Sequence, residues 1–117
     1  MDLAELTDRL EAVSRVYAAR FDITRDDTWH LLKIHEEVGE LTDAYLVATG
    51  RSRRRGRSAA EIETALKDEL CDVVAHTLLM ARHLGFDLTR ELERKWLVHH
   101  PDESAAASGP QNSSPHA

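Results

Sequence analysis

The chain has 117 residues, of which 42% are apolar, 31% are charged and only 5% are aromatic, and its formal net charge at pH 7 is -6. This length allows one compact domain with its own core and excludes two. Ala, Leu, Glu and Arg recur throughout, a composition that favours helices over a β-sandwich or barrel. We therefore predict an all-α fold with a single domain over residues 1–100.

The sequence also bears on the compartment. A single cysteine, Cys71, excludes an intramolecular disulfide and is typical of a reducing compartment, and we expect its thiol to be buried and inert. No apolar run approaches the length of a membrane span, and the charged sequence MDLAELTDRLEA lacks the basic-then-apolar order of a signal peptide. We predict a cytoplasmic protein that makes no contact with a membrane.

A first amphipathic helix is predicted at the N-terminus and is expected to end near Phe21. Its apolar positions recur at steps of three and four residues and are Leu3, Leu6, Leu10, Val13, Val16 and Tyr17. The second predicted helix runs from about residue 28 to residue 49, after the capping residues Thr24, Asp26 and Asp27 and before Gly50. The sequence GRSRRRGRS that follows has no apolar residue, so we expect a mobile loop there.

Ser58 and Glu61 form a capping box that starts a third helix, predicted over residues 59–84 and ended by Gly85. The periodicity of this helix predicts a core-facing stripe. The stripe consists of Leu66, Leu70, Val73, Val74, Thr77, Ala81 and Leu84.

A fourth helix is predicted from Asp87 or Thr89 to about His99, before Pro101. The remaining residues, 101–117, are small, polar and interrupted by proline. They offer too little apolar surface to offset the entropy of ordering, so we predict a disordered C-terminal tail.

Two pairs of carboxylates with a spacing of three residues lie on the second and third predicted helices. They are Glu37 and Glu40 in the sequence EEVGE, and Glu69 and Asp72 in the sequence ELCD. The two members of a pair share a helix face, and most such pairs are merely solvated surface. Here Glu69, Asp72 and His76 fall within one arc flanked by apolar residues, where carboxylates repel one another and lose hydration unless a cation compensates them.

The two pairs are expected to face each other. Glu37 and Glu40 also border an apolar stripe, and the loop is long enough for the two helices to pair antiparallel. A cage of carboxylate oxygens suits a hard cation, with water and substrate phosphates completing its coordination. We predict that Glu37, Glu40, Glu69 and Asp72 bind Mg²⁺, for which Mn²⁺ is a substitute.

The order EExxE, a spacer and ExxD, on two helices of a short chain, resembles the MazG-like nucleoside triphosphate pyrophosphohydrolases, which are related to the all-α dimeric dUTPases. The resemblance covers about residues 26–100, including WHLLKIHEEVGELTDAYL and ALKDELCDVVAHTLLMARHLGFDL. It implies a four-helix bundle completed by oligomerisation, as a homodimer or a dimer of dimers. It also implies hydrolysis of a nucleoside triphosphate between its α and β phosphates to monophosphate and pyrophosphate, as nucleotide-pool housekeeping.

The resemblance also implies roles for individual residues. Glu37, Glu40, Glu69 and Asp72 would be the magnesium ligands, and Glu36 would either bind through water or orient the attacking water. Since a nearby carboxylate must accept a proton from that water, Glu36 and Glu37 are the predicted catalytic residues.

Four further residues are candidates for contacts with substrate. Lys95 in ERKW resembles a lysine that many family members place near the phosphates, although WLVHHP replaces the usual ending that contains asparagine. Lys33 lies one turn before the first motif, and Arg54 represents the arginine loop, whose guanidinium groups either clamp phosphates or remain solvated. Trp29 can stack on a base, although a lone tryptophan on a helix is more often part of the core.

Other classes of function remain open. His35-Glu36 resembles the start of a histidine-kinase dimerisation helix, but the proline that usually follows is missing. The Glu-x-x-His pairs of a di-iron bundle are missing as well. The arginine loop is a weak candidate for nucleic-acid binding, which the acidic remainder opposes. The main alternative to an enzyme is a MazG-fold chain that binds nucleotide, or dimerises, without turnover.

Overall fold

The structure is a computed structural model that describes residues 1–102. These residues form α-helices and one short 3₁₀ helix and contain no strand, which confirms the predicted all-α class. The elements are α1 (Leu3–Arg20), α2 (Asp27–Ala48), α3 (Ala59–Leu84), α4 (Leu88–Lys95) and η1 (Leu97–His99). Most of the predicted tail, from residue 103 on, lies outside the described residues.

The helices begin at the side chains that the sequence marks as caps. The carboxylate of Asp26 accepts a hydrogen bond from the Trp29 amide at the start of α2. The predicted capping box of α3 is formed in both directions, because the Ser58 amide donates to Glu61 Oε1 at 3.0 Å and the Glu61 amide donates to Ser58 Oγ at 3.1 Å. These bonds satisfy amide groups that have no partner within the helix, and they explain why the predicted starts are accurate.

Glycines end the two long helices. Gly50 and Gly85 have φ angles of 77° and 80°, respectively, a left-handed conformation that costs glycine little and other residues more. α2 therefore stops at the arginine loop, and α3 stops before the segment that carries α4.

The fourth helix is shorter than predicted. We expected it to reach about His99, but α4 ends at Lys95 and a 3₁₀ turn follows. The Trp96 amide is shared between the Leu92 and Glu93 carbonyls, and the His99 amide donates to the carbonyl of Trp96, three residues back. The chain tightens into three-residue hydrogen bonding here, as often happens where an α-helix ends.

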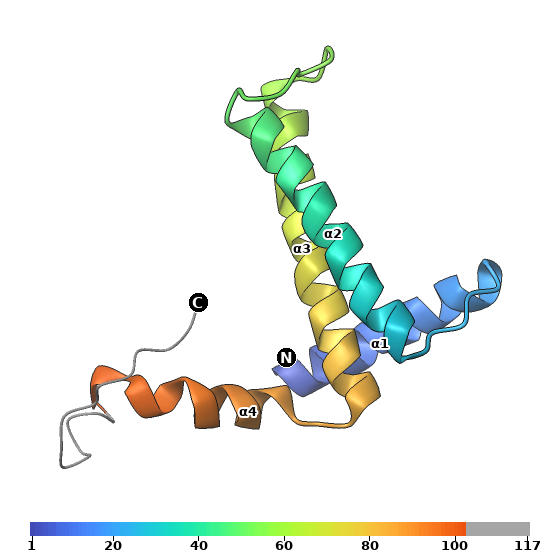
Figure 1. Cartoon of the computed structure of the whole chain (residues 1–117), viewed down its shortest axis with the longest axis vertical. Coiled ribbons are helices and arrows are strands. Elements are labelled where there is room, and N and C mark those ends of the chain that lie inside the picture. The colour runs from blue at the N-terminus through green and yellow to red at the C-terminus, as the bar shows by residue number, and fades with distance from the viewer. Residues whose placement is uncertain (103–117) are drawn as a thin grey trace. The chain divides into compact units, whose positions relative to one another are not determined.

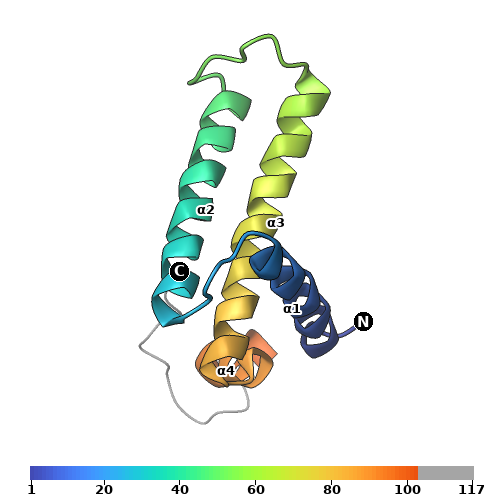
Figure 2. The ribbon, with the colours of Figure 1, turned by 90° about the vertical axis from the view of Figure 1, so that its right-hand side faces the viewer.

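Residues 1–84 form one compact unit, and the segment that begins at Gly85 forms another. In the first unit α2 and α3 lie side by side and antiparallel, joined at one end by the loop of residues 49–58 (Figure 1). α1 packs against α3 near the opposite end of the pair (Figure 2). The antiparallel pairing brings the middle of α2 opposite the middle of α3, where the two acidic motifs lie.

The core of the first unit is small and consists of side chains from all three helices. Its buried apolar residues are Ala18, Ala44, Val47, Ile62, Leu78, Leu79 and Ala81. Ala81 belongs to the stripe predicted for α3, but the prediction is wrong for Leu70, Val74 and Leu84, which are 53%, 50% and 47% exposed in the single chain. α3 has two overlapping apolar arcs, and the periodicity of a sequence does not say which of them faces α2.

An ion-pair network fixes α1 to the turn that follows it. Glu11 is buried and accepts hydrogen bonds from both terminal nitrogens of Arg25 at 2.8 Å and from Nε of Arg15 at 2.7 Å. The hydrogen bond to Arg25, assisted by Arg15 and opposed by burial, lowers the pKa of Glu11 to about 2. Such a carboxylate remains ionised and holds the two segments together.

Two observations concern the predicted compartment. The expectation that Cys71 is buried is wrong, because its side chain is exposed on α3, in a part of the helix surface that α2 does not cover. In the described part of the chain, no helix combines the length and the apolar character that crossing a membrane requires.

Candidate functional site

Three carboxylates from the two acidic motifs converge between α2 and α3. Glu37 and Glu40 on α2 and Glu69 on α3 each offer one oxygen, and these oxygens all lie within 4.8 Å of one another. The convergence follows from the spacing of three residues, which puts Glu37 and Glu40 on one face of α2, and from the antiparallel pairing of the helices. The structure thus brings together three of the four residues that the sequence suggests as metal ligands.

Glu37 lies at the centre of this carboxylate cluster. It is only 6% exposed, and its Oε2 atom is buried without a hydrogen-bond partner. Burial raises its pKa to about 7, with further contributions from a hydrogen bond to Glu40 and from the charges of Glu40 and Asp72, while Lys33 acts in the opposite direction. Ionised Glu37 is therefore costly unless a cation compensates it.

Glu69 completes the cluster from α3. Its Oε2 atom is also buried without a partner, and its pKa is raised by loss of solvent and by the charges of Glu40 and Asp72. Two buried carboxylate oxygens without partners, side by side with a third carboxylate, form a set of donors that suits a hard cation such as Mg²⁺ or Mn²⁺. Buried polar groups normally have a hydrogen-bond partner, so the two unpartnered oxygens are unusual.

Asp72 lies near the cluster but outside the set of three oxygens. It is exposed, and it lines a cavity together with Glu37. Its charge contributes to the raised pKa of both Glu37 and Glu69. Asp72 is thus an electrostatic neighbour of the cluster.

Lys33 and Glu36 lie next to the cluster on α2. Nζ of Lys33 is 3.3 Å from Oε2 of Glu36 and 3.6 Å from Oε1 of Glu37. Burial alone would lower the pKa of Lys33, but the hydrogen bond to Glu36 and the charges of both glutamates outweigh it and raise that pKa. The side chain of Glu36 is 56% exposed and that of Lys33 is 21% exposed, so Lys33 is the partly buried member of this pair.

An open cavity of about 370 Å³ adjoins the cluster and is lined by residues of α1, α2 and α3. Glu37, Asp72 and Lys33 line it on the side of the cluster, and its other walls are largely apolar or aromatic. Trp29, a candidate for base stacking, lines this cavity. The contribution of α1 was not anticipated, because α1 carries no acidic motif and its amphipathic pattern alone does not distinguish a cavity wall from core.

His76 forms one wall of the cavity. Its Nε2 atom lies 4.0 Å from Oε1 of Glu37, and its ring stands edge-on to Trp29 with centroids 5.9 Å apart. The Nδ1 atom is buried and has no hydrogen-bond partner. Burial and the charge of Lys33 lower the pKa of His76, which favours the neutral imidazole.

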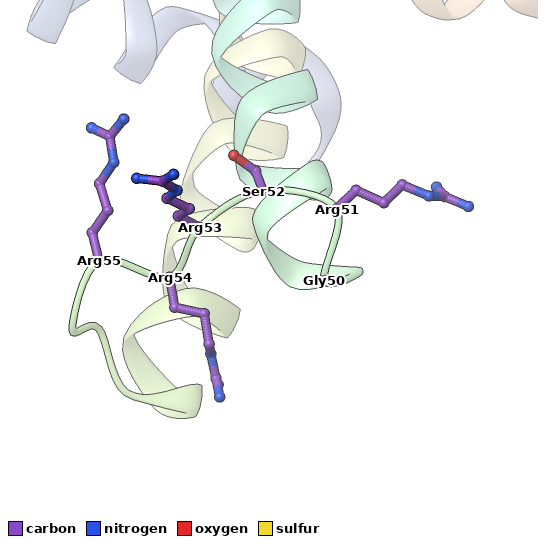
Figure 3. Close-up of a pocket in the computed structure, with 6 residues that line it drawn as sticks. All are labelled: Gly50, Arg51, Ser52, Arg53, Arg54 and Arg55. Atoms are coloured by element: carbon purple, nitrogen blue, oxygen red, sulfur yellow. The ribbon is translucent and has the colours of Figure 1, made fainter.

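One of the predicted phosphate-binding residues, Arg54, is not brought to the cluster. Arg54 belongs to the loop, and Gly50 at its start is ten residues after Glu40, which corresponds to about 15 Å along a helix. Figure 3 shows that the side chains of Arg51, Arg53, Arg54 and Arg55 extend in different directions and do not converge on one point. Lys95 belongs to the second unit.

Searches of protein-family models, of curated proteins and of solved structures each gave no match to this chain.

Proposed function

We propose that this chain is a magnesium-dependent nucleoside triphosphate pyrophosphohydrolase that releases a nucleoside monophosphate and pyrophosphate. The observation that carries the proposal is the convergence of Glu37, Glu40 and Glu69, with two buried oxygens that lack partners. The order and spacing of the two acidic motifs support it, because they resemble those of MazG-like enzymes.

Glu37, Glu40 and Glu69 would hold the cation, with Asp72 beside them, and Mn²⁺ would substitute for Mg²⁺. When bound, the ion would neutralise charge on the phosphate oxygens and lower the pKa of a coordinated water. Its charge would also offset the burial and the repulsion that raise the pKa of Glu37 and Glu69.

The reaction forms a bond between a water oxygen and the α-phosphorus and breaks the bond from that phosphorus to the oxygen bridging to the β-phosphate. Pyrophosphate leaves with the bonding electrons, and the proton of the water passes to a carboxylate. Glu36 is exposed enough to meet water, so in this proposal it orients the water and accepts the proton, with Glu37 as its neighbour. Lys33 lies within 4 Å of both glutamates and would turn to the phosphate oxygens.

The proposal includes self-association. Large apolar side chains on both long helices are exposed in the single chain, among them Leu31, Leu32, Val38, Leu70 and Val74. Where exposed apolar side chains form a large patch, a partner usually covers it. We expect a homodimer or a dimer of dimers in which helices of neighbouring chains complete a four-helix bundle.

We expect the enzyme to act in the cytoplasm in nucleotide-pool housekeeping. An exposed and unpaired thiol such as that of Cys71 persists in a reducing compartment.

The test is a screen of the purified protein against canonical, deoxy and modified nucleoside triphosphates with and without Mg²⁺, in which pyrophosphate and orthophosphate are separated. Monophosphate and pyrophosphate, formed by the wild type and not by Glu69→Gln, would support the proposal. If nucleotides bind but none is turned over with Mg²⁺ or Mn²⁺, the chain is a nucleotide-binding protein instead.

A further inference from the structure

We infer that a second recess, lined by α1, α2, α3 and the turn before α2, binds an inorganic phosphate or pyrophosphate ion without a metal. This inference goes beyond the proposed function and does not depend on it. The Glu11 recess, as we name it, is open and has a volume of about 270 Å³. Its lining residues are all ionisable and are Glu11, Arg15, Arg25, His30, Arg82 and His83.

The Glu11 recess is separate from the carboxylate cluster, with which it shares no residue. On α2, His30 precedes Glu37 by seven residues, which corresponds to about 10 Å along a helix. On α3, Arg82 follows Glu69 by 13 residues, which corresponds to about 20 Å. An anion in the recess would therefore not meet the carboxylates of the cluster.

Glu11 fixes two of the three guanidinium groups of the recess. Its oxygens accept hydrogen bonds from Nε of Arg15 and from both terminal nitrogens of Arg25. The hydrogen bond from Arg25, opposed by burial and assisted by Arg15, lowers the pKa of Glu11 to about 2. The carboxylate is thus ionised at neutral pH and keeps both guanidinium groups in place. Donors that are held before a ligand arrives lose less side-chain entropy when it binds.

The recess has more hydrogen-bond donors than the protein itself uses. Arg15 donates through Nε, and both of its terminal nitrogens lack a hydrogen-bond partner within residues 1–102. Arg82 pairs with Asp8 through one terminal nitrogen, and its other terminal nitrogen and its Nε lack a partner in the same part of the chain. The side chains of Arg15 and Arg82 are 68% and 39% exposed. These nitrogens are therefore accessible donors for a ligand.

The charge of the lining favours an anion. Three arginines line the recess together with a single glutamate. Asp8 and Asp27, which pair with Arg82 and His83, lie outside the lining, and their side chains are 67% and 80% exposed, so water and salt screen them. Burial lowers the pKa of His30, so the positive charge that an anion would meet comes from the arginines.

The chemistry and the size of the recess select the ligand. Guanidinium groups bind phosphate oxygens through paired, charge-assisted hydrogen bonds. Guanidinium groups from several segments can surround a tetrahedral ion, whereas a planar carboxylate accepts a bidentate pair from a single arginine. The volume of about 270 Å³ lies below the roughly 300–1,000 Å³ that is typical of sites for organic ligands. We therefore expect a small inorganic ion and not a nucleotide.

Calorimetric titration with inorganic phosphate and with inorganic pyrophosphate tests the inference, in EDTA and at constant ionic strength, so that no metal takes part. Arg15→Gln and Arg9→Gln are matched substitutions on α1. Their side chains are 68% and 71% exposed, and each pairs with the glutamate four residues before it, but Arg15 lines the recess and Arg9 does not. On α3, Lys67→Gln is the control for Arg82→Gln, because Lys67 forms an exposed pair with Glu63 outside the recess.

We expect the wild type to bind pyrophosphate, and Arg15→Gln and Arg82→Gln each to weaken that binding by about tenfold or more, as loss of a hydrogen bond to a charged group does. Arg9→Gln and Lys67→Gln should stay within about twofold of wild type, because salt screens exposed charges at a distance. Glu69→Gln should bind pyrophosphate as the wild type does. Since hydrolysis is not measured, the result does not depend on the proposed reaction.

The inference would be overturned if the wild type bound neither ion without a metal, or if the control variants lost as much affinity as the arginine variants of the recess. Loss of binding in Glu69→Gln would move the ion to the carboxylate cluster and would overturn it as well. Citrate that binds as tightly as pyrophosphate would make the recess a carboxylate site instead. Urea unfolding identifies a variant that has lost its fold, and in that case the other arginine variant and its control decide.

Discussion

Nζ of Lys33 lies 3.3 Å from a carboxylate oxygen of Glu36 and 3.6 Å from one of Glu37. A single ammonium group therefore forms ion pairs with both glutamates at the start of the first acidic motif. Glu37 has no other cation this close in the described residues. Lys33 therefore compensates part of the charge that a metal ion would compensate.

Replacing Lys33 with methionine should strengthen metal binding, because the ion no longer competes with the ammonium group. We expect the dissociation constant for Mn²⁺, measured by electron paramagnetic resonance, to fall by roughly threefold to tenfold, as suits a partly solvated charge pair. Lys67→Met is the matched control, since Lys67 pairs with Glu63 on the exposed face of α3. Unchanged or weaker Mn²⁺ binding in Lys33→Met would show that Lys33 does not oppose the metal.

Glu69→Gln should separate stability from activity. Removing one charge from the cluster relieves repulsion, so the metal-free variant should be more stable than wild type by about 1 kcal/mol in urea unfolding. The rate of hydrolysis should fall by more than the roughly 10–100-fold that is typical when a residue hydrogen-bonded to a metal ligand is lost. Glu63→Gln, on the same helix but 69% exposed, should change neither property. A Glu69→Gln variant that is inactive only because it unfolds would contradict this prediction.

The raised pKa of Glu37 predicts how the metal-free protein responds to pH. Its carboxyl titrates near 7 in the folded chain and near 4.5 when unfolded, so the folded state holds an extra proton between these values. The contribution of Glu37 to the free energy of unfolding should therefore be greatest below about pH 4.5. It should fall by up to roughly 3 kcal/mol as the pH rises to 7 and above.

The measurement is urea unfolding in EDTA across this pH window for wild type and Glu37→Gln. As the pH rises, the free energy of unfolding of Glu37→Gln should increase relative to that of the wild type. Saturating Mg²⁺ should restore the stability of wild type at pH 8 by binding the folded state. An identical pH response in both proteins would mean that Glu37 ionises normally.

Glu11 should have the opposite pH dependence. Its pKa is lowered from 4.5 to about 2 by Arg25 and Arg15, so its contribution is fully present above about pH 4.5 and is lost as pH falls towards 2. Glu11→Gln leaves Arg25, only 16% exposed, without its carboxylate partner and should lower the free energy of unfolding by about 3 kcal/mol at pH 7. Glu5→Gln, which removes an exposed pair with Arg9, should cost less than about 1 kcal/mol. Equal losses of unfolding free energy in Glu11→Gln and Glu5→Gln would contradict a stabilising role of the Glu11 network.

Much of this arrangement could be predicted from the sequence, because local rules set the helix ends. Asp26, Ser58 and Asp87 are caps in the sequence and in the structure. The spacing of three residues in each motif predicted that Glu37 and Glu40 share a face, and the length of the loop predicted the antiparallel pairing that brings Glu69 to them.

The rest depends on packing between segments far apart in the sequence. The positions of Leu70 and Val74 relative to α2 depend on which of two apolar arcs is covered, and either arc satisfies the helical period. The cavity depends on how Val13 and Tyr17 of α1 lie against α2 and α3, for which no local pattern exists. The sequence ranked Lys95 slightly ahead of Lys33 as a phosphate-binding candidate. Lys33 lies four residues before Glu37 on α2, so its position beside that glutamate follows from helix spacing alone.

The central claim is attack of water on the α-phosphorus with the help of the carboxylate cluster. Hydrolysis of the best nucleoside triphosphate in ¹⁸O-labelled water, followed by mass spectrometry of the products, tests it most directly. We expect one ¹⁸O in the nucleoside monophosphate, none in pyrophosphate, a requirement for Mg²⁺ or Mn²⁺, and no reaction in Glu69→Gln. Label in released orthophosphate or in pyrophosphate, or no turnover of any triphosphate with either metal, would contradict it.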